Sequence, residues 1–309
     1  MLFFDSFKNS ANQWLGEHQG HTIVIKREDL IDPLISGNKY RKLKYVFQRL
    51  AHENRSGIIT FGGAFSNHLA ATANAGFRCG IKTIGVVRGE EWQQKIHKSE
   101  TLSFCQNIGM ELYCISRGAY RLKELAPQVQ RLLTNNENLF ILPEGGSGSE
   151  AIQGCEEILT AEDELFNTVC VSVGTGGTIS GIINTAKPHQ TVVGFNALKN
   201  NNIEKEVKRF TTDKTFEIQS DYTFGGYAKV SIELVDFMNS FYQQYKIPLD
   251  PLYTGKMLFG IFDLIKTHKW KWGRKILVIH TGGLQGVKPM NRRLKAKGFP
   301  QFTYVDMLP

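Results

Sequence analysis

The stretch Val169-Cys170-Val171-Ser172-Val173, followed directly by Gly174-Thr175-Gly176-Gly177-Thr178, decides the fold. An apolar run that ends in glycines, with a helical pattern after it, predicts a buried strand, a tight loop and a helix from Thr178. In such a loop consecutive backbone N–H groups can converge, and the helix N-terminus adds positive potential. The stretch therefore predicts a phosphate-binding loop, with a plain turn as the alternative.

The same alternation of short apolar strands and helical patterns runs through the rest of the chain. Strands are expected at Ile23–Ile25, Ile58–Phe61, Ile81–Val87, Leu112–Ile115, Leu139–Leu142, Val192–Phe195 and Ile276–Ile279. Helices are expected near Lys39, Ser66, Glu91, Pro127, Ser149, Thr178, Ile232–Tyr242 and Lys256–Ile265. This order predicts an α/β protein with mainly parallel, doubly wound sheets, whose ligands bind at the carboxyl ends of the strands.

Composition narrows the class of protein. The chain has 309 residues, 41% hydrophobic and 21% charged, which is ordinary for a folded protein of about two domains. The formal charge of +8 suggests an anionic ligand such as a phosphorylated cofactor or a carboxylate substrate. The basic and aromatic run Lys269–Lys275 could indicate nucleic acid, but it stands directly before an apolar strand, so we expect no nucleic-acid partner.

The cysteines and the apolar runs indicate the compartment. The five cysteines are widely spaced and include no Cys-x-x-Cys pair, which argues against a disulfide framework or a zinc site. Charge interrupts the N-terminus at Asp5, too early for a signal peptide, and no apolar run has the length of a membrane span. We expect a cytoplasmic protein with no bound metal and no membrane partner.

Three further strand ends carry polar groups or glycines. Ile58–Phe61 is followed by a loop that ends in Ser66-Asn67-His68, which either caps the next helix or holds a carboxylate. His68 has a structural role as its alternative. Leu139–Leu142 is followed by Pro143–Ser149, whose glycines permit close approach to a ligand or form a flexible surface loop. Ile276–Ile279 is followed by His280-Thr281-Gly282-Gly283.

Lys39 occupies an unusual position. It follows the turn signal Gly37-Asn38 and starts the apolar face of a helix that continues through Leu43, Val46, Phe47 and Leu50. Burial and the positive helix N-terminus both favour the neutral amine, which is the form that imine chemistry requires. The alternative is a lysine whose amine extends to water along an apolar surface.

The phosphate ligand is not a dinucleotide. A G-x-G-x-x-G fingerprint counted from Gly174 would need glycine at Ile179, and the next strand ends at Asn196 without a carboxylate. The chain also has no G-x-x-x-x-G-K-[ST] sequence. A phosphate loop combined with an imine-forming lysine indicates pyridoxal 5'-phosphate (PLP).

Several motifs in order resemble one family. Lys26-Arg27-Glu28-Asp29, Gly37-Asn38-Lys39-x-Arg41-Lys42-Leu43, Ser66-Asn67-His68, Gly174–Thr178, Asp250-Pro251-Leu252-Tyr253-Thr254-Gly255-Lys256 and His280–Gly283 are similar to segments of the 1-aminocyclopropane-1-carboxylate deaminases and D-cysteine desulfhydrases. The resemblance runs from about Lys26 to Gly286. It implies a PLP enzyme of the tryptophan-synthase-beta-like fold (fold type II), usually a homodimer. It also implies a larger PLP-binding domain over 1–44 and 156–309 and a smaller inserted domain over 45–155.

The resemblance implies roles for single residues. Lys39 matches the lysine that binds the cofactor covalently and moves the Cα proton. Asn67 matches the partner of the cofactor's ring hydroxyl, and Ser66, with Asn67 and His68, lies in the segment that binds the substrate carboxylate. Gly174, Thr175, Gly176, Gly177 and Thr178 match the phosphate loop. Tyr227 and Tyr253 resemble substrate-facing tyrosines, for which packing is the alternative, and Thr281 resembles the hydroxyl near the pyridine nitrogen.

One departure from the pattern indicates the activity. Cyclopropane deaminases typically have Glu where this chain has Thr254, and a hydroxyl supplies no fixed negative charge to keep the ring nitrogen protonated. The sequence therefore favours a D-cysteine-desulfhydrase-like lyase, which deprotonates Cα and eliminates to a keto acid and ammonia. Opening of the cyclopropane ring to 2-oxobutyrate is the alternative, and an inactive PLP-binding protein is a third. A second departure is Gly225-Gly226-Tyr227-Ala228-Lys229, where the family commonly has Gly-x-Pro after the tyrosine.

Overall fold

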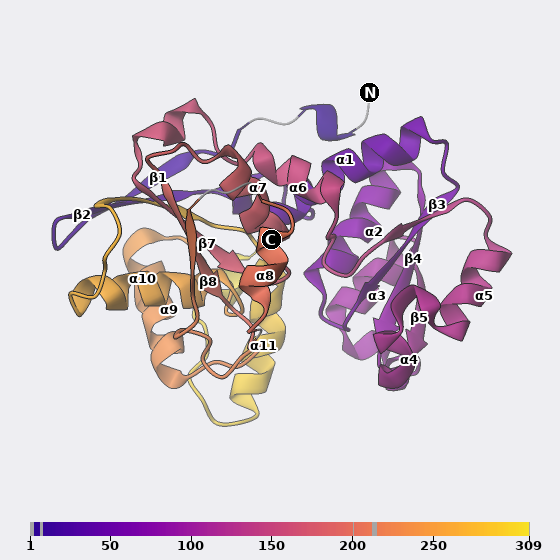
Figure 1. Ribbon diagram of the computed structural model, residues 1–309. Coiled ribbons are helices and arrows are strands. Elements are labelled where there is room, and N and C mark those ends of the chain that lie inside the picture. The colour runs from indigo at the N-terminus through magenta and orange to yellow at the C-terminus, as the bar shows by residue number, and fades with distance from the viewer. Residues whose placement is uncertain (1–2, 7–8, 200, 212–214, 309) are drawn as a thin grey trace. The chain divides into compact units, whose positions relative to one another are not determined.

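The chain forms two compact α/β units, each built around its own sheet (Figure 1). The computed structural model describes residues 3–6, 9–199, 201–211 and 215–308. One unit comprises Met1–Phe7 and Lys39–Gly154, and the other comprises Lys8–Asn38 and Cys155–Pro309. The chain therefore passes from one unit to the other between Asn38 and Lys39 and again between Gly154 and Cys155.

The second unit contains a six-stranded sheet with the order β1-β2-β10-β7-β8-β9. Its strands are β1 (Asn12–His18), β2 (His21–Lys26), β7 (Thr168–Val173), β8 (Thr191–Asn196), β9 (Phe216–Gln219) and β10 (Lys275–Ile279). All neighbours pair in parallel except β1, which is antiparallel to β2. The four predicted strands of this unit are present, whereas β1 and β9 were not predicted.

Strand β1 forms one edge of this sheet and contains an irregularity. Its register against β2 shifts between Trp14 and Gly16, and Gly16 has φ +112°. Leu15 lies at this shift with its side chain buried in the core, while Trp14 is 58% exposed. The shift is a β-bulge, which bends the strand and increases its twist.

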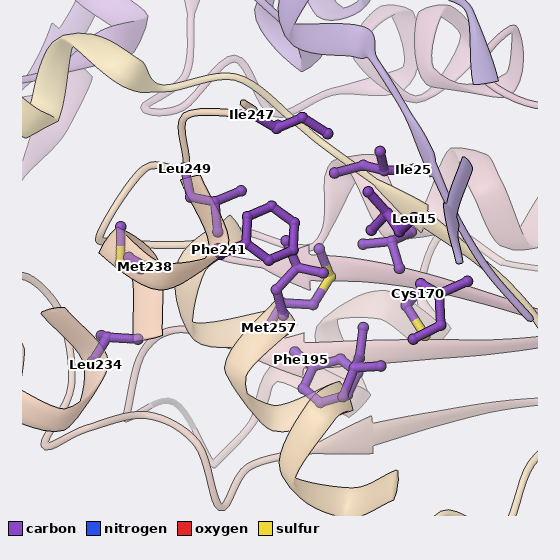
Figure 2. Packing of buried hydrophobic residues seen from close by; sticks show 14 of the residues in the cluster. Leu15, Ile25, Cys170, Phe195, Leu234, Met238, Phe241, Ile247, Leu249 and Met257 are labelled. Carbon is purple, nitrogen blue, oxygen red and sulfur yellow. The ribbon is translucent and has the colours of Figure 1, made fainter. Parts of the chain in front are cut away.

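Helices cover both faces of the six-stranded sheet. They are α7 (Gly177–Thr185), α8 (Ile203–Lys208), α9 (Ile232–Tyr245), α10 (Thr254–Lys266) and α11 (Val287–Lys295). Successive residues of β7 contribute to opposite faces, because Cys170 belongs to the cluster that includes residues of α9 and α10, part of which Figure 2 shows, whereas Val171 belongs to the cluster that includes Ile182 of α7. A strand buried on both faces explains its continuous apolar sequence.

The first unit contains a four-stranded parallel sheet with the order β5-β4-β3-β6. Its strands are β3 (Gly57–Gly62), β4 (Lys82–Arg88), β5 (Glu111–Ile115) and β6 (Leu139–Leu142). Its helices are α1 (Asn38–His52, whose first residue belongs to the other unit), α2 (Asn67–Cys79), α3 (Glu100–Asn107), α4 (Arg117–Arg121) and α5 (Pro127–Asn135). Helix α6 (Ser149–Glu156) spans the second chain crossing. Apolar clusters lie on both faces of the sheet, one with Val129 of α5 and the other with Leu69 of α2.

The expected α/β architecture with two parallel-sheet units is confirmed, with one local difference. Instead of one helix near Glu91, the chain forms short 3-10 turns at Glu90–Trp92 and Ile96–Lys98 before α3 begins. Helix α3 begins at Glu100 because Ser99 caps it: the Ser99 Oγ accepts a hydrogen bond from the Leu102 amide at 3.2 Å. None of the helices in the described ranges is long and apolar enough to cross a membrane.

Candidate active site

The glycine loop after β7 leads directly into helix α7. Gly176 is the N-cap of this helix and has φ +87°, a left-handed conformation that favours glycine. Because glycine has no side chain, it supplies no capping acceptor to the first-turn N–H groups. An uncapped helix N-terminus after a strand suits a phosphate group.

Asn38 connects this loop to the end of β10. Its side-chain Nδ2 donates to the Thr178 Oγ1 at 2.9 Å, and its backbone N–H donates to the Thr281 carbonyl oxygen at 3.3 Å. Since Thr178 accepts this bond, its own hydroxyl proton is left to donate to a ligand. Asn38 is the residue before Lys39, so these bonds fix the backbone from which the lysine extends.

Gly37 permits the contact with the end of β10. It has φ +64°, and a Cβ atom there would lie 2.0 Å from the Thr281 carbonyl oxygen. On the opposite side of the contact, Gly282 has φ +77°, and its Cβ would lie 2.6 Å from the Ser36 Oγ. The two backbones therefore meet at a distance that only glycine allows.

Lys39 lies in the first turn of α1 and is half-buried. The predicted apolar face that follows it is confirmed, because the side chains of Leu43, Val46, Phe47 and Leu50 are at most 1% exposed. Lys39 is thus carried by a helix that is anchored in the core of its unit.

Two hydroxyl side chains and one carboxylate lie near the start of α10 and the end of β10. The Asp250 carboxylate accepts the backbone N–H groups of Leu252, Tyr253 and Thr254 at 2.8–3.0 Å, so both of its oxygens take part in shaping this segment. The Thr254 Oγ1 is fully buried and has no hydrogen-bond partner within the described part of the chain. The Thr281 Oγ1 lies 3.4 Å from the Ser172 Oγ.

The two candidate tyrosines have rings in edge contact. The centroids of Tyr227 and Tyr253 are 6.5 Å apart with an interplanar angle of 60°. Tyr227 is 49% exposed, whereas Tyr253 is partly buried and stands 3.3 Å from the Cβ position of Gly174. The structure thus places Tyr253 beside the glycine loop after β7 and Tyr227 against Tyr253.

Ser66 and Asn67 lie at the start of α2 in the first unit. The Ser66 Oγ accepts the Leu69 amide at 3.3 Å, so the predicted helix cap is present. The Asn67 Oδ1 is buried and has no hydrogen-bond partner among the residues described. A buried amide oxygen without a partner is costly, and a hydroxyl of a ligand would satisfy it.

His68 is buried in the first unit, and its imidazole ring is neutral. Its Nε2 lies 2.8 Å from the Thr60 Oγ1, which itself donates to the Leu142 carbonyl oxygen at 2.9 Å, so Nε2 carries the proton. Burial holds the pKa of His68 well below its ordinary value, and the charges of Lys39 and Lys42 lower it further. The Nδ1 atom, which has no partner in the described ranges, can accept a hydrogen bond.

The loop after β6 packs against this group. Lys42 donates from its Nζ to the Gly145 carbonyl oxygen at 3.3 Å, and a Cβ on Gly146 would lie 3.1 Å from the His68 ring. Gly145, Gly146 and Gly148 all have positive φ. These glycines thus allow the loop to approach His68.

Several site residues were missed at the sequence level. Ser172 lies within the quoted strand, but its approach to Thr281 depends on pairing between β7 and β10. Asp250 and Lys256 belong to a motif that was quoted without a role for either residue. His280 also has a supporting role, since its Nε2 donates to the Pro248 carbonyl oxygen at 2.8 Å and its Nδ1 accepts the Gly282 N–H at 3.2 Å.

Comparison with known proteins identifies the family. The family model for pyridoxal-phosphate dependent enzymes matches residues 11–282. The chain belongs to this family. It is an enzyme family that uses PLP, and the expected cofactor and fold class are thereby confirmed. Within the unit of the six-stranded sheet, the buried Thr254 hydroxyl and the loop at Gly176 are groups that fit PLP.

Three relatives illustrate the likeness. A Thermotoga maritima protein, provisionally named 1-aminocyclopropane-1-carboxylate deaminase, is 32% identical over 91% of this chain and 94% of its own. The bifunctional D-cysteine desulfhydrase/1-aminocyclopropane-1-carboxylate deaminase of Arabidopsis thaliana is 28% identical over 88% of this chain and 75% of its own. A crystal structure of an ACC deaminase homologue superposes with a TM-score of 0.76 at 25% identity, covering 97% and 93% of the two chains.

Proposed function

We propose that the protein is a PLP-dependent lyase that eliminates from a small amino acid such as D-cysteine and releases a keto acid and ammonia. The observation that carries this proposal is the fully buried hydroxyl of Thr254, which has no partner within the described residues. The relatives named above include a bifunctional enzyme whose name gives both activities, so we base the choice between the two on this position.

The Asp250 carboxylate strengthens the argument. It is the acid closest in sequence to Thr254, and three backbone N–H groups already occupy its oxygens. Thr254 and Thr281 therefore offer hydroxyls, without a negative charge, to the ring nitrogen. A ring nitrogen without a carboxylate partner is less readily protonated and withdraws electrons more weakly. Such a site suits a substrate with a good leaving group on Cβ better than a strained ring.

The proposed reaction gives each candidate site residue a separate role. PLP, when bound, supplies the electron sink for a carbanion at Cα. The Lys39 Nζ takes the Cα proton as general base, and Ser66 and Asn67 bind the substrate carboxylate and the cofactor ring. Gly174–Thr178 bind the phosphate through backbone N–H groups and the Thr178 hydroxyl. Tyr227 and Tyr253 face the substrate, and His68 accepts a hydrogen bond at its Nδ1.

A substrate panel tests the activity. Release of pyruvate and sulfide from D-cysteine would be compared with release of 2-oxobutyrate from 1-aminocyclopropane-1-carboxylate, and L-cysteine would serve as the stereochemical control. We expect the D-cysteine reaction to have the higher kcat/KM. Turnover of the cyclopropane alone would reverse the assignment in favour of the deaminase.

Borohydride trapping tests the role of Lys39. Reduction of the PLP-loaded protein, followed by peptide mapping, should label Lys39 and no other lysine. Lys39→Ala should lose the label, and Lys44→Ala in the same helix should retain it. Labelling of a different lysine would contradict the proposal.

We further propose a cytoplasmic homodimer in which the unit of the six-stranded sheet is the larger, PLP-binding domain. The five cysteines are all free, which supports a reducing compartment. The domain boundaries expected near residues 45 and 155 stay predictions. Light scattering of the purified protein would give a mass of about twice 34.9 kDa for a dimer.

A further inference from the structure

The loop that carries Tyr227 has an unusual backbone. Phe224, Gly225, Gly226 and Ala228 have φ of +52°, +90°, +107° and +55°. Left-handed backbone is unfavourable for residues other than glycine, which applies to Phe224 and Ala228. Such a loop keeps its conformation only if its surroundings hold it.

One buried ammonium group holds this loop from inside. The Lys256 Nζ donates to the carbonyl oxygens of Thr223 and Gly226, each at 2.8 Å, and the residue is 2% exposed. The Thr223 carbonyl also accepts the Gly226 N–H at 2.9 Å, and the Gly226 carbonyl accepts the Lys229 N–H at 3.2 Å. Lys256 therefore joins the two ends of the turn that precedes Tyr227, through charge-assisted hydrogen bonds.

The other end of Lys256 is fixed by helix α10. Lys256 lies in the first turn of this helix, two residues after Thr254 and three after Tyr253. The next residue, Met257, is packed in the core (Figure 2), so the helix is firmly held. Aromatic contacts extend the attachment, since the rings of Phe224 and Phe259 are 5.0 Å apart.

The position is an unfavourable one for a charge. The positive end of the helix and burial both oppose an ammonium group there. Burial lowers the pKa of Lys256 to about 8, and the Asp250 charge opposes this decrease. An apolar side chain could fill the same space without lowering the stability of the protein. The two hydrogen bonds of the amine to carbonyl oxygens therefore indicate that Lys256 shapes the loop.

We propose that Lys256 is a positioning residue, which fixes Tyr227 against Tyr253 by clamping the Thr223–Gly226 turn to helix α10. The inference deepens the proposed function, on which the role of Tyr227 toward substrate rests. No catalytic contact is assigned to Lys256 itself. Its effect on the reaction passes through the place of the Tyr227 ring.

Hydrogen exchange tests the clamp without reference to activity. In Lys256→Met the full-length protein, with and without PLP, should exchange the amide protons of residues 221–229 at least about tenfold faster than the parent protein. Lys266→Met, an exposed position on the same helix, should leave these rates unchanged. Lys256→Arg retains the positive charge and the hydrogen-bond donors, so it should restore part of the protection against exchange. This variant is the one to measure if Lys256→Met does not fold. Unchanged exchange in the folded variant, or no protection from Arg, would overturn the clamp.

A double-mutant cycle with Tyr227→Phe tests the positioning. Lys256→Met should lower kcat by about 10- to 100-fold in the parent protein and by less than about twofold in the Tyr227→Phe background. Equal effects in the two backgrounds would show that Lys256 does not act through Tyr227. If no substrate of the panel is turned over, the proposed function fails, whereas the exchange experiment still decides the clamp.

Discussion

Substitution of Gly37 by alanine tests the backbone contact that fixes the chain before Lys39. The new Cβ would lie 2.0 Å from the Thr281 carbonyl oxygen and 2.3 Å from the Thr281 carbonyl carbon. Both neighbours are backbone atoms, so no side-chain rotation can relieve the overlap. The Asn38 N–H···O hydrogen bond to Thr281 would be displaced with it.

The expected cost has two parts. Alanine at φ +64° costs about 1–2 kcal/mol, and the forced displacement of packed backbone adds about 1–3 kcal/mol. The sum, about 2–5 kcal/mol, should appear in the free energy of unfolding. Gly298→Ala is the matched control in the same unit, because Gly298 has φ +67° and nothing within 4 Å of its Cβ position. It should cost only the first part.

Urea unfolding followed by tryptophan fluorescence would measure both variants. Three of the four tryptophans, Trp14, Trp270 and Trp272, lie in the unit that contains Gly37, and a Trp92→Phe background would restrict the signal to that unit. Gly37→Ala should also reduce the fraction of Lys39 that borohydride traps with PLP. Equal unfolding costs for Gly37→Ala and Gly298→Ala would refute the reasoning.

Three further predictions concern buried polar groups. Lys26 and Asp163 form a buried ion pair at 2.7 Å, and the Asp163 carboxylate also accepts hydrogen bonds from Asn12 and Thr160. In urea unfolding, Asp163→Asn should therefore lower the free energy of unfolding by about 3–5 kcal/mol, and Lys26→Met should lower it by at least about 1 kcal/mol less. A larger loss for Lys26→Met than for Asp163→Asn would contradict this account. Thr254→Glu should lower kcat/KM for D-cysteine and raise the ratio of cyclopropane turnover to D-cysteine turnover by at least about tenfold. Thr254→Gln is the matched variant without the charge and should not raise this ratio. An unchanged ratio in Thr254→Glu would show that this position does not determine the choice of substrate. Burial lowers the pKa of Lys256 from about 10.5 in the unfolded chain to about 8 in the folded chain. Between about pH 8 and about pH 10.5 the unfolded chain therefore binds more protons at this residue than the folded chain does. Lys256 should thus make the free energy of unfolding increase as the pH rises through this range. Lys256→Met should lack this gain when unfolding is compared at about pH 7 and about pH 9.5, and an identical gain in both proteins would be incompatible with the lowered pKa.

The sequence predicted the buried strands because strands covered on both faces are continuously apolar. It did not predict β1, where Leu15 is the one buried side chain of the strand and a bulge interrupts the alternation. It also missed β9, whose four residues are all half-buried. The helix expected near Glu91 begins instead at Glu100, after the capping residue Ser99.

The strand-end motifs of the candidate site were readable because each combines glycines or hydroxyls with a preceding apolar run. The contacts among them were not. The bonds from Asn38 to Thr178 and from Lys256 to Thr223 join residues 140 and 33 positions apart, and they depend on how the sheet order brings segments together. Local pattern carries no information on such pairs.

The bulge in β1 has a consequence for the protein in concentrated solution. An edge strand offers unpaired backbone groups to any other strand, and a flat edge with an exposed tryptophan such as Trp14 invites sheet-to-sheet association between molecules. The register shift at Gly16 breaks the regular spacing of those groups, so a second strand cannot pair along the whole edge. The bulge should thus hinder aggregation of the six-stranded sheet through its β1 edge.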